Sequence, residues 1–320
     1  MRRFLGGGCP VRTLEWKEGR GDVLRWSRMG SIDRFVGFVL IAVSAAGFGT
    51  LAISGRYAYD DGLDALTILF FRFFLSAVIL VGAFVVRREA MPRGRVLLRL
   101  VGMGAFGYVG QAFCYLTALK FASAGLVALL LYLYPAFVAV LSVMVLREPM
   151  TRFKVTALCL ALIGTALTVG PGGGQGMGIF LGVSAAVIYS VYIIVGTSVV
   201  KEVTAVQSST VIFASAGVMS GLLVVVKGMQ MPASLSGWWA IVSIVLLATV
   251  LPVVTFLAGL KRTGPTNAAM LSTLEPVVTV GLAAFLLGET LKPVTMAGGA
   301  LILSAVLLLA HGELRRRAPR

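Results

Sequence analysis

One carboxylate stands inside a long apolar stretch of this sequence and is the first candidate for chemistry. Glu275 lies about ten residues into the apolar run 266–287 and is followed by Pro276. An acid at that depth in hydrocarbon costs about 2.5–3.5 kcal/mol, so it must face other protein groups, be protonated or be paired. Such an acid suits binding of a cationic or amino group of a solute, or transfer of a coupling proton. It equally suits a structural role beside Pro276, satisfying a carbonyl that the proline leaves without an N–H partner.

Arg72 is the one basic residue more than three residues from either end of an apolar run. At 1.5 Å per residue it lies about 10 Å from the outer end of the run 65–86. Its long side chain can reach outward to the membrane surface, or it can pair with Glu275. The residue types alone leave both interpretations open.

Uncharged polar residues within the apolar runs are the remaining candidates for a solute pathway. They are Gln111, Tyr115, Tyr132, Tyr134, Tyr189, Tyr192, Asn267 and Ser272. Tyrosines in membrane proteins commonly anchor a helix at the interface, but that explanation weakens in the middle of a run. We therefore expect Tyr134 to form an aromatic wall of the pathway.

The elements that must position these residues are membrane-spanning helices. The chain has 320 residues, of which 58% are hydrophobic and 13% charged, and its mean hydropathy is +0.95. This excludes a soluble globular enzyme, because soluble proteins are about 25% charged. Apolar runs close to the roughly 20 residues that cross a bilayer occur at 34–54, 65–86, 97–118, 124–146, 153–170, 177–198, 208–226, 237–259, 266–287 and 293–311. The predicted fold is an all-α integral membrane protein with ten transmembrane helices.

The basic residues set the expected orientation. With the N-terminus in the cytoplasm, 23 of the 28 Lys and Arg residues fall on the cytoplasmic side and four on the other. This bias predicts a multi-pass protein of the cell (inner) membrane with both termini cytoplasmic. The net charge of +15 is then a topology signal with anionic membrane lipids as its partners, and no nucleic acid is expected.

The two ends of the chain are predicted to be cytoplasmic basic tails. Residues 1–33 contain no apolar stretch of the kind that a signal peptide needs. We expect them to be disordered, or Met29 to be the true start of the protein. Residues 312–320 form the second tail.

An internal repeat organises the runs between the tails. A shift of 141 residues aligns 115–167 with 256–308 without a gap, and places Pro135 on Pro276 and Glu148 on Glu289. The repeat predicts two halves of five helices, 34–170 and 177–311. Because five is odd, the halves have opposite orientations in the membrane, an arrangement typical of secondary transporters.

The segments 129–151 and 270–292, which carry these prolines and glutamates, resemble the two signature segments of EamA-type carriers of the drug/metabolite transporter superfamily. The resemblance covers residues 34–311 and implies ten helices in two inverted repeats. It also implies a pathway lined mainly by spans 1, 3, 4, 6, 8 and 9, and export of amino acids or other small metabolites by many members.

Four residues of the repeat are predicted to shape the helices, two prolines as kinks and two glutamates at helix ends. Pro135 and Pro276 lack an N–H and kink their helices, either for packing or, as we favour, as hinges for alternating access. Glu148 and Glu289 fall where one helix ends and the next begins, where a carboxylate offsets the partial positive charge of a helix N-terminus. We expect both acids to be structural.

The sequence thus predicts a secondary transporter that moves a small organic metabolite, such as an amino acid, outward by alternating access. Protons are a possible coupling partner, and the oligomeric state is open. An intramembrane enzyme and a permease subunit of a larger complex are the alternatives, but no catalytic cluster or long coupling loop is evident. The scattered Cys9, Cys114 and Cys159 and the single His311 predict no metal site or cofactor.

Overall fold

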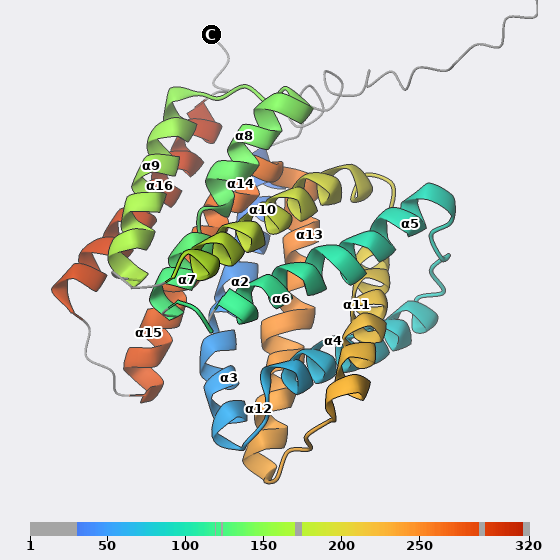
Figure 1. Ribbon diagram of the computed structural model, residues 1–320. Helices are drawn as coiled ribbons and strands as arrows, with labels where there is room; N and C mark the ends of the chain where they lie inside the picture. The colour runs from blue at the N-terminus through green and yellow to red at the C-terminus, as the bar shows by residue number, and fades with distance from the viewer. Residues whose placement is uncertain (1–30, 119, 123, 170–174, 288–291, 316–320) are drawn as a thin grey trace, which may run out of the picture.

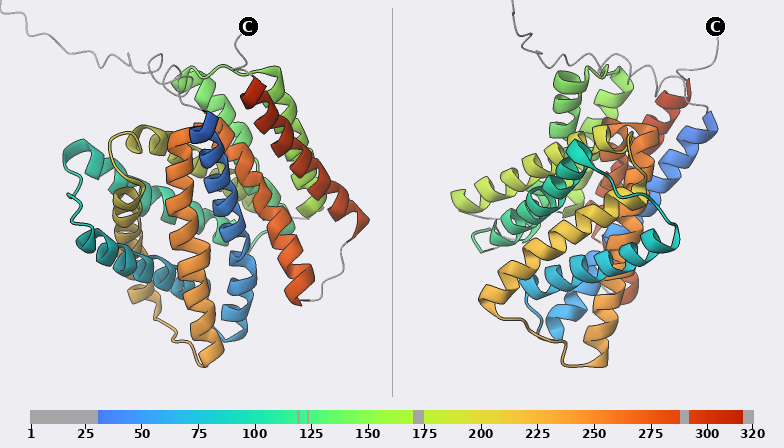
Figure 2. Two further views of the ribbon diagram at one scale, coloured as in Figure 1. Left: turned by 180° about the vertical axis from the view of Figure 1, so that it is seen from behind. Right: turned by 90° about the vertical axis from the view of Figure 1, so that its right-hand side faces the viewer.

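The computed structural model describes residues 31–118, 120–122, 124–169, 175–287 and 292–315. In these ranges the chain forms helices joined by short loops (Figure 1). The N-terminal tail predicted for 1–33, the possible start at Met29 and the acid Glu289 lie wholly or largely outside the described residues. The two ends of the described chain, the start of α2 and the end of α16, lie at the same end of the bundle (Figure 2).

The helices follow the predicted runs closely. In chain order they are α2 (Ser31–Gly49), α3 (Leu51–Asp60), α4 (Ala65–Val86), α5 (Gly94–Gly102), a π-helical turn (Met103–Tyr108), α6 (Val109–Ala118), α7 (Ala124–Leu131), α8 (Tyr134–Leu146), α9 (Arg152–Val169), α10 (Gly176–Val199), α11 (Ala205–Lys227), α12 (Leu235–Val245), a second π-helical turn (Leu246–Val250), α13 (Leu251–Thr263), α14 (Pro265–Leu271), a 3₁₀ turn (Ser272–Leu274), α15 (Glu275–Leu287) and α16 (Pro293–Arg315).

Eight helical stretches are long and apolar enough to cross a membrane. They are Ile32–Asp60, Ala65–Val86, Gly94–Tyr115, Leu126–Leu146, Gly176–Val199, Ala205–Lys227, Leu235–Thr263 and Pro265–Leu286. Pro293–Leu309 is a shorter apolar helix. Helix α9 carries Arg152 and Lys154 in its first turn, which leaves about 15 residues where a crossing needs roughly 20. The structure supports eight spans and a shorter apolar helix, and the count of ten stays a prediction.

Both repeats contain a π-helical turn in their third span. The turns Met103–Tyr108 and Leu246–Val250 fall at nearly equivalent places, since a shift of 141 residues carries the first onto 244–249. Single π-turns inside helices are rare and are frequent at functional sites. This shared feature did not show in the sequence; Pro252 lies two residues after the second turn.

The fourth span of each repeat is also interrupted. The break comes just before the proline that the two halves share, Pro135 in the first and Pro276 in the second. Helix α7 ends at Leu131 and α8 begins at Tyr134, one residue before Pro135. The equivalent 3₁₀ turn Ser272–Leu274 ends one residue before Glu275 and Pro276. Both interruptions place backbone groups beside the interior of the bundle, where other protein groups can satisfy them.

The helix contacts have the symmetry of the repeat. Span 1 packs on span 8 through α2 and α13, and the equivalent pair, spans 6 and 3, packs through α10 and α6. The other extensive contacts are between a helix and the equivalent helix of the other half, α4 with α11 and α9 with α16. In both views of Figure 2 the two halves interlock instead of standing side by side. The bundle therefore has two similar halves that share one core.

Two acids anchor the loop between α3 and α4, Asp61 to the start of α12 and Asp64 to the start of α4 and to Lys227 at the end of α11. The Asp61 carboxylate accepts hydrogen bonds from the hydroxyl of Ser234 and from the N–H groups of Ala233 and Ser234. These bonds, the hydroxyl of Ser234 first, lower the pKa of Asp61 below its ordinary value. Asp64 caps α4 by accepting from the Thr67 N–H at 2.8 Å. The pKa of Asp64 is also lowered, since its bonds to Lys227 and Thr67 outweigh the effect of burial, which acts in the opposite direction.

The close approach of α2 to the second π-turn depends on Gly47. A Cβ atom at this position would lie 2.6 Å from Pro252 Cγ and 2.7 Å from the Leu247 carbonyl oxygen. Overpacking of this kind costs about 1–3 kcal/mol, so we expect Gly47→Ala to lower the apparent melting temperature of the detergent-solubilised protein. Gly102→Ala is the matched control, because nothing lies within 4 Å of its Cβ position. Equal melting temperatures for the two variants would contradict this packing.

Candidate functional site

A cavity of about 590 Å³ lies between the two repeats. This is within the roughly 300–1,000 Å³ of pockets that enclose small molecules. Most of its wall comes from the first repeat, and α10 and α15 of the second repeat complete it. The lining residues are Phe48, Leu51, Gly55, Arg56, Tyr59, Ala65, Ile68, Leu69, Arg72, Tyr108, Gln111, Ala112, Tyr115, Ala128, Leu131, Tyr132, Tyr134, Tyr189, Glu275, Pro276, Thr279 and Val280.

Most of the pathway residues predicted from the sequence meet at this cavity. Those that line it are Glu275, Tyr134, Gln111, Tyr115 and Tyr189. Asn267 and Ser272 are not among the lining residues, and their side chains bond backbone carbonyls four residues earlier in the chain. The Asn267 Nδ2 donates to the Thr263 carbonyl at 2.9 Å, and the Ser272 hydroxyl donates to the Ala268 carbonyl at 2.9 Å.

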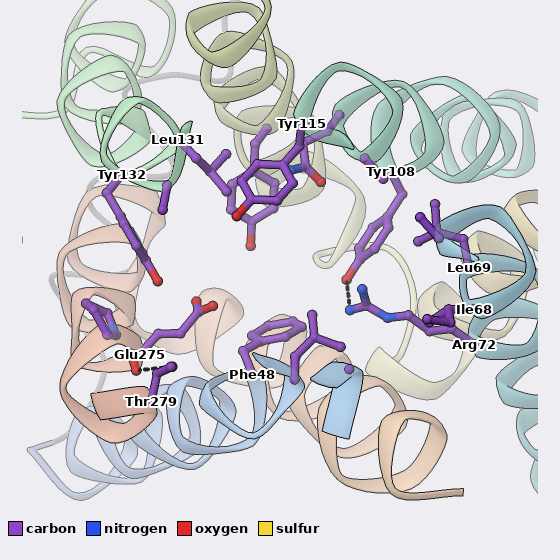
Figure 3. Close-up of a pocket in the computed structure, with 18 of the residues that line it drawn as sticks. Phe48, Ile68, Leu69, Arg72, Tyr108, Tyr115, Leu131, Tyr132, Glu275 and Thr279 are labelled. Atoms are coloured by element: carbon purple, nitrogen blue, oxygen red, sulfur yellow. Dashed lines mark hydrogen bonds between the residues drawn. The ribbon is translucent and has the colours of Figure 1, made fainter. Parts of the chain in front are cut away.

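The Glu275 carboxylate points into the cavity from the first turn of α15 (Figure 3). Its backbone carbonyl accepts a hydrogen bond of 3.1 Å from the hydroxyl of Thr279. Among the described residues the carboxylate forms no ion pair, so the direct pairing with Arg72 that the sequence left open is not formed. The acid is available to a solute on the cavity side.

Arg72 lies across the cavity from Glu275 (Figure 3). Its side chain does not reach outward to the membrane surface, and that interpretation of the sequence is wrong. The residue is only 7% exposed, and its Nε donates to the hydroxyl of Thr249 at 2.8 Å. Its Nη2 contacts the Tyr108 hydroxyl and the Ala248 carbonyl, both at 3.3 Å. The Arg72 side chain points inward because these partners bind it there. The sequence of span 2 contains none of them, so it could not predict this direction.

The two hydroxyl partners of Arg72 are equivalent positions of the repeat. Tyr108 ends the first π-turn and Thr249 lies in the second, and the 141-residue shift carries one onto the other. The Arg72 side chain therefore bridges the π-turns of the two halves. Tyr108 was missed by the sequence analysis, and the repeat offset together with the depth of Arg72 is the signal that could have found it.

Tyr134 forms one aromatic side of the cavity. Its ring packs edge-on against Tyr189 with the centroids 4.8 Å apart, and its hydroxyl donates to the Ala269 carbonyl of the second repeat at 3.3 Å. Tyr134 is also the equivalent of Glu275 under the repeat. Equivalent positions of the two halves thus present a phenol and an acid to the same space.

The lining reaches toward one end of the bundle, away from the chain ends. Arg56 and Tyr59, near the end of α3, line the cavity and are exposed, and α3 ends opposite the start of α2 and the end of α16 (Figure 2). On the side of the termini, every residue from 263 to 273 is buried. The cavity therefore approaches the surface at the end opposite the termini and is closed toward the termini by α14.

A buried polar cluster joins the halves on the closed side. The Glu148 carboxylate, 6% exposed, accepts from Lys154 Nζ and also accepts a hydrogen bond of 2.7 Å from the hydroxyl of Thr266 at the start of α14. Glu148 was expected to be structural, but the sequence did not indicate its partners. Its equivalent Glu289 lies outside the described residues.

The outer surface of the bundle is apolar in the manner of a protein surrounded by lipid. Large hydrophobic side chains stand exposed on α4, α11 and α15, such as Val86 at 83%, Val226 at 89% and Phe285 at 85%. A soluble protein rarely exposes apolar surface on this scale. With eight apolar stretches of spanning length, the fold is that of a multi-pass membrane protein, and its interior contains a cavity of the size of a small molecule.

Comparison with known proteins gives the family. The model of the EamA-like transporter family matches residues 35–170 and again 176–310, and the chain therefore belongs to that family. The two matches also reproduce the two halves expected from the internal repeat.

Individual relatives agree with this assignment. The chain is 28% identical over 272 residues to an uncharacterized transporter of Archaeoglobus fulgidus, covering 85% of this chain and 95% of that protein. It is 25% identical over 279 residues to the uncharacterized transporter YcbK of Bacillus subtilis, covering 82% and 88%. A crystal structure of a protein with 20% identity has the same fold, with a TM-score of 0.75 over 87% of this chain and 97% of the other.

The buried pair of Lys154 and Glu148 leads to a stability prediction. Lys154→Met leaves a buried carboxylate without its cation, which costs about 3–5 kcal/mol, so we expect a clearly lower apparent melting temperature. Adding Glu148→Gln removes the uncompensated charge and should restore most of the loss. Lys227→Met is the matched control, because the Lys227 side chain is 58% exposed and exposed pairs contribute about 0–1 kcal/mol. If Lys154→Met were no more damaging than Lys227→Met, the cluster would not hold the closed side together.

Proposed function

We propose that this protein is a secondary transporter of the cell (inner) membrane that exports a small organic metabolite, such as an amino acid, by alternating access. The observation that carries the proposal is the cavity between the two repeats, which approaches the surface at one end and is closed at the other. A site enclosed by two related halves is the arrangement expected of a carrier. The names of the relatives agree with a transporter.

The proposed orientation places both termini and the Glu148 cluster in the cytoplasm. It rests on the distribution of the basic residues and on the chain ends lying at one end of the bundle. In this orientation the described conformation faces outward, with Arg56 and Tyr59 near the outer mouth. To face inward, α14 must separate from the segment around Glu148, and the interruptions before Pro135 and Pro276 are suited to act as hinges for that motion.

The energy source in this proposal is a proton gradient or the gradient of the solute itself. Export as the direction rests on the resemblance to EamA-type carriers, many of which export metabolites. The repeats are compatible with either direction, because a carrier follows the gradients that are applied.

Export is tested by comparing metabolite pools in cells with and without the protein. Expression should lower the intracellular amount of at least one amino acid or related metabolite and raise its amount in the medium. A mass-spectrometric profile of both compartments measures this. The control is the doubly substituted Glu275→Gln/Arg72→Gln protein, matched for its amount in the membrane. Enhanced uptake in place of release would contradict export.

Alternating access is tested by thiol labelling in a protein without its three native cysteines. Tyr59→Cys, at a position 51% exposed, should react with a membrane-impermeant maleimide added from outside, whereas Asn267→Cys, at a position 5% exposed, should be protected. Adding Glu148→Gln weakens the closed side, so labelling of Asn267→Cys from the cytoplasm should rise while that of Tyr59→Cys falls. Changes in the same direction at both positions would contradict a carrier that opens to one side at a time.

A further inference from the structure

Helices α4 and α11 run side by side (Figure 2) and are joined at both ends. At the end of the bundle where the cavity approaches the surface, Asp64 caps α4, and its Oδ2 accepts from Lys227 Nζ at the end of α11 at 2.6 Å. The Thr67 hydroxyl accepts a hydrogen bond of 3.3 Å from the Gln230 N–H. We call these two contacts the outer clasp.

The opposite end of the pair has a second set of contacts, which we call the inner clasp. Thr204 caps α11, and its hydroxyl donates to Glu89 Oε2 at 2.7 Å. The Gln207 Nε2 donates to the Ala90 carbonyl at 2.9 Å. Because Glu89 and Ala90 lie in the loop that follows α4, this clasp joins the start of α11 to the end of α4.

The repeat relates the two clasps. In this part of the chain the shift is 140 residues, one fewer than in the later spans, and it carries Thr67 onto Gln207 and Ala90 onto Gln230. The outer contact between Thr67 and Gln230 therefore becomes the inner contact between Gln207 and Ala90. The donors and acceptors differ between the two ends, but the joined positions are the same. The junction of these helix ends is thus a feature of both halves.

Between the clasps the two helices pack closely. A Cβ atom at Gly217 of α11 would lie 3.2 Å from the Cα atom of Phe74 on α4. The fully buried rings of Phe73 and Phe213 stack with their centroids 6.2 Å apart. Neither helix is interrupted, whereas spans 3, 4, 8 and 9 are. Because the two continuous helices are joined along their length and at both ends, we expect them to move as one body.

A contact that gates a carrier is formed at the closed end of the cavity and broken at the open end. The clasps do not follow this rule, because both are formed in one conformation, the outer clasp beside the open end and the inner clasp at the closed end. We propose that α4 and α11 stay joined at both ends throughout the transport cycle, as a fixed pair beside which the interrupted spans move. The inference rests on the proposed carrier function and identifies the helices that do not separate during it.

The fixed pair divides the wall of the cavity. Arg72 lies on α4 and belongs to the fixed side, and Glu275 lies across the cavity at the break of span 9 and belongs to the moving side (Figure 3). Opening and closing the cavity therefore changes the distance between Arg72 and Glu275, while Arg72 keeps its place within the pair.

Cross-linking at equivalent positions of the two ends tests the pair. In the full-length protein without its three native cysteines, Ala65→Cys with Gln230→Cys reports on the outer end. Ala90→Cys with Ala205→Cys, which the 140-residue shift relates to the first pair, reports on the inner end. The clasps stay in place, because residues 90 and 230 contribute only main-chain atoms to them. Each pair is bridged with a bifunctional methanethiosulfonate, with and without Glu148→Gln, and the rate of bridging is followed by mass spectrometry.

The rate of bridging at each end should agree within about twofold with and without Glu148→Gln, which favours the inward-facing form. An end that opened in that form would instead lose about tenfold or more, the change that corresponds to a shift of about 1.4 kcal/mol in the equilibrium. Release of the exported metabolite should continue after both ends are bridged. The matched control is a bridge between Glu148→Cys and Thr266→Cys, across the contact that must open, and this bridge should stop release.

Loss of bridging at one end in the Glu148→Gln protein, or release that stops when both ends are bridged, would overturn the proposal. The proposed carrier function fails in a different way, through absence of reciprocal labelling at Tyr59→Cys and Asn267→Cys. Reciprocal labelling combined with loss of bridging refutes the fixed pair alone. Constant bridging without reciprocal labelling refutes the transport cycle itself.

Discussion

The structure depends on one constraint, which is that backbone N–H and C=O groups have no water to bind within a bilayer. A spanning helix can therefore break only where protein or an aqueous cavity receives the freed groups. The π-turns of spans 3 and 8 and the turns before Pro135 and Pro276 are such breaks. Tyr108, Tyr134 and Glu275 bring three of these breaks to the cavity wall, while helices such as α4 and α11, which expose long apolar surfaces, run without interruption.

The two halves supply a symmetric scaffold with an asymmetric site. The interruptions and the helix pairs repeat under the same shift, yet Tyr134 and Glu275 occupy equivalent positions with different chemistry. Because both halves line one cavity, Tyr134 and Glu275 face the same space. Equivalent positions with different side chains therefore give the cavity two chemically distinct sides, while the helix packing of the two halves stays alike.

Local patterns predicted the fold well because helix length, apolarity and charge bias are properties of short segments. The places of the helices, the repeat and the family follow from them. The site was predicted in part: mid-run polarity located Glu275, Tyr134 and Gln111 on the cavity wall. The prediction of the site failed where the role of a residue depends on the direction of its side chain or on a partner far away in the sequence. Arg72 turns inward because Tyr108 and Thr249 receive it, and Glu148 is held by Lys154 and Thr266; no single segment contains that information.

The position of Arg72 has an electrical consequence. Its partners Tyr108 and Thr249 are equivalent residues of the two halves, so its guanidinium is held between equivalent positions of the repeat. Under the proposed alternating access, a group held between equivalent positions of two inverted halves stays at nearly the same depth. Moving one elementary charge through the membrane costs about 2.3 kcal/mol per 100 mV, and a stationary charge avoids that work. Under that proposal, the protein keeps a full positive charge within the bilayer without making its conformational exchange sensitive to membrane voltage.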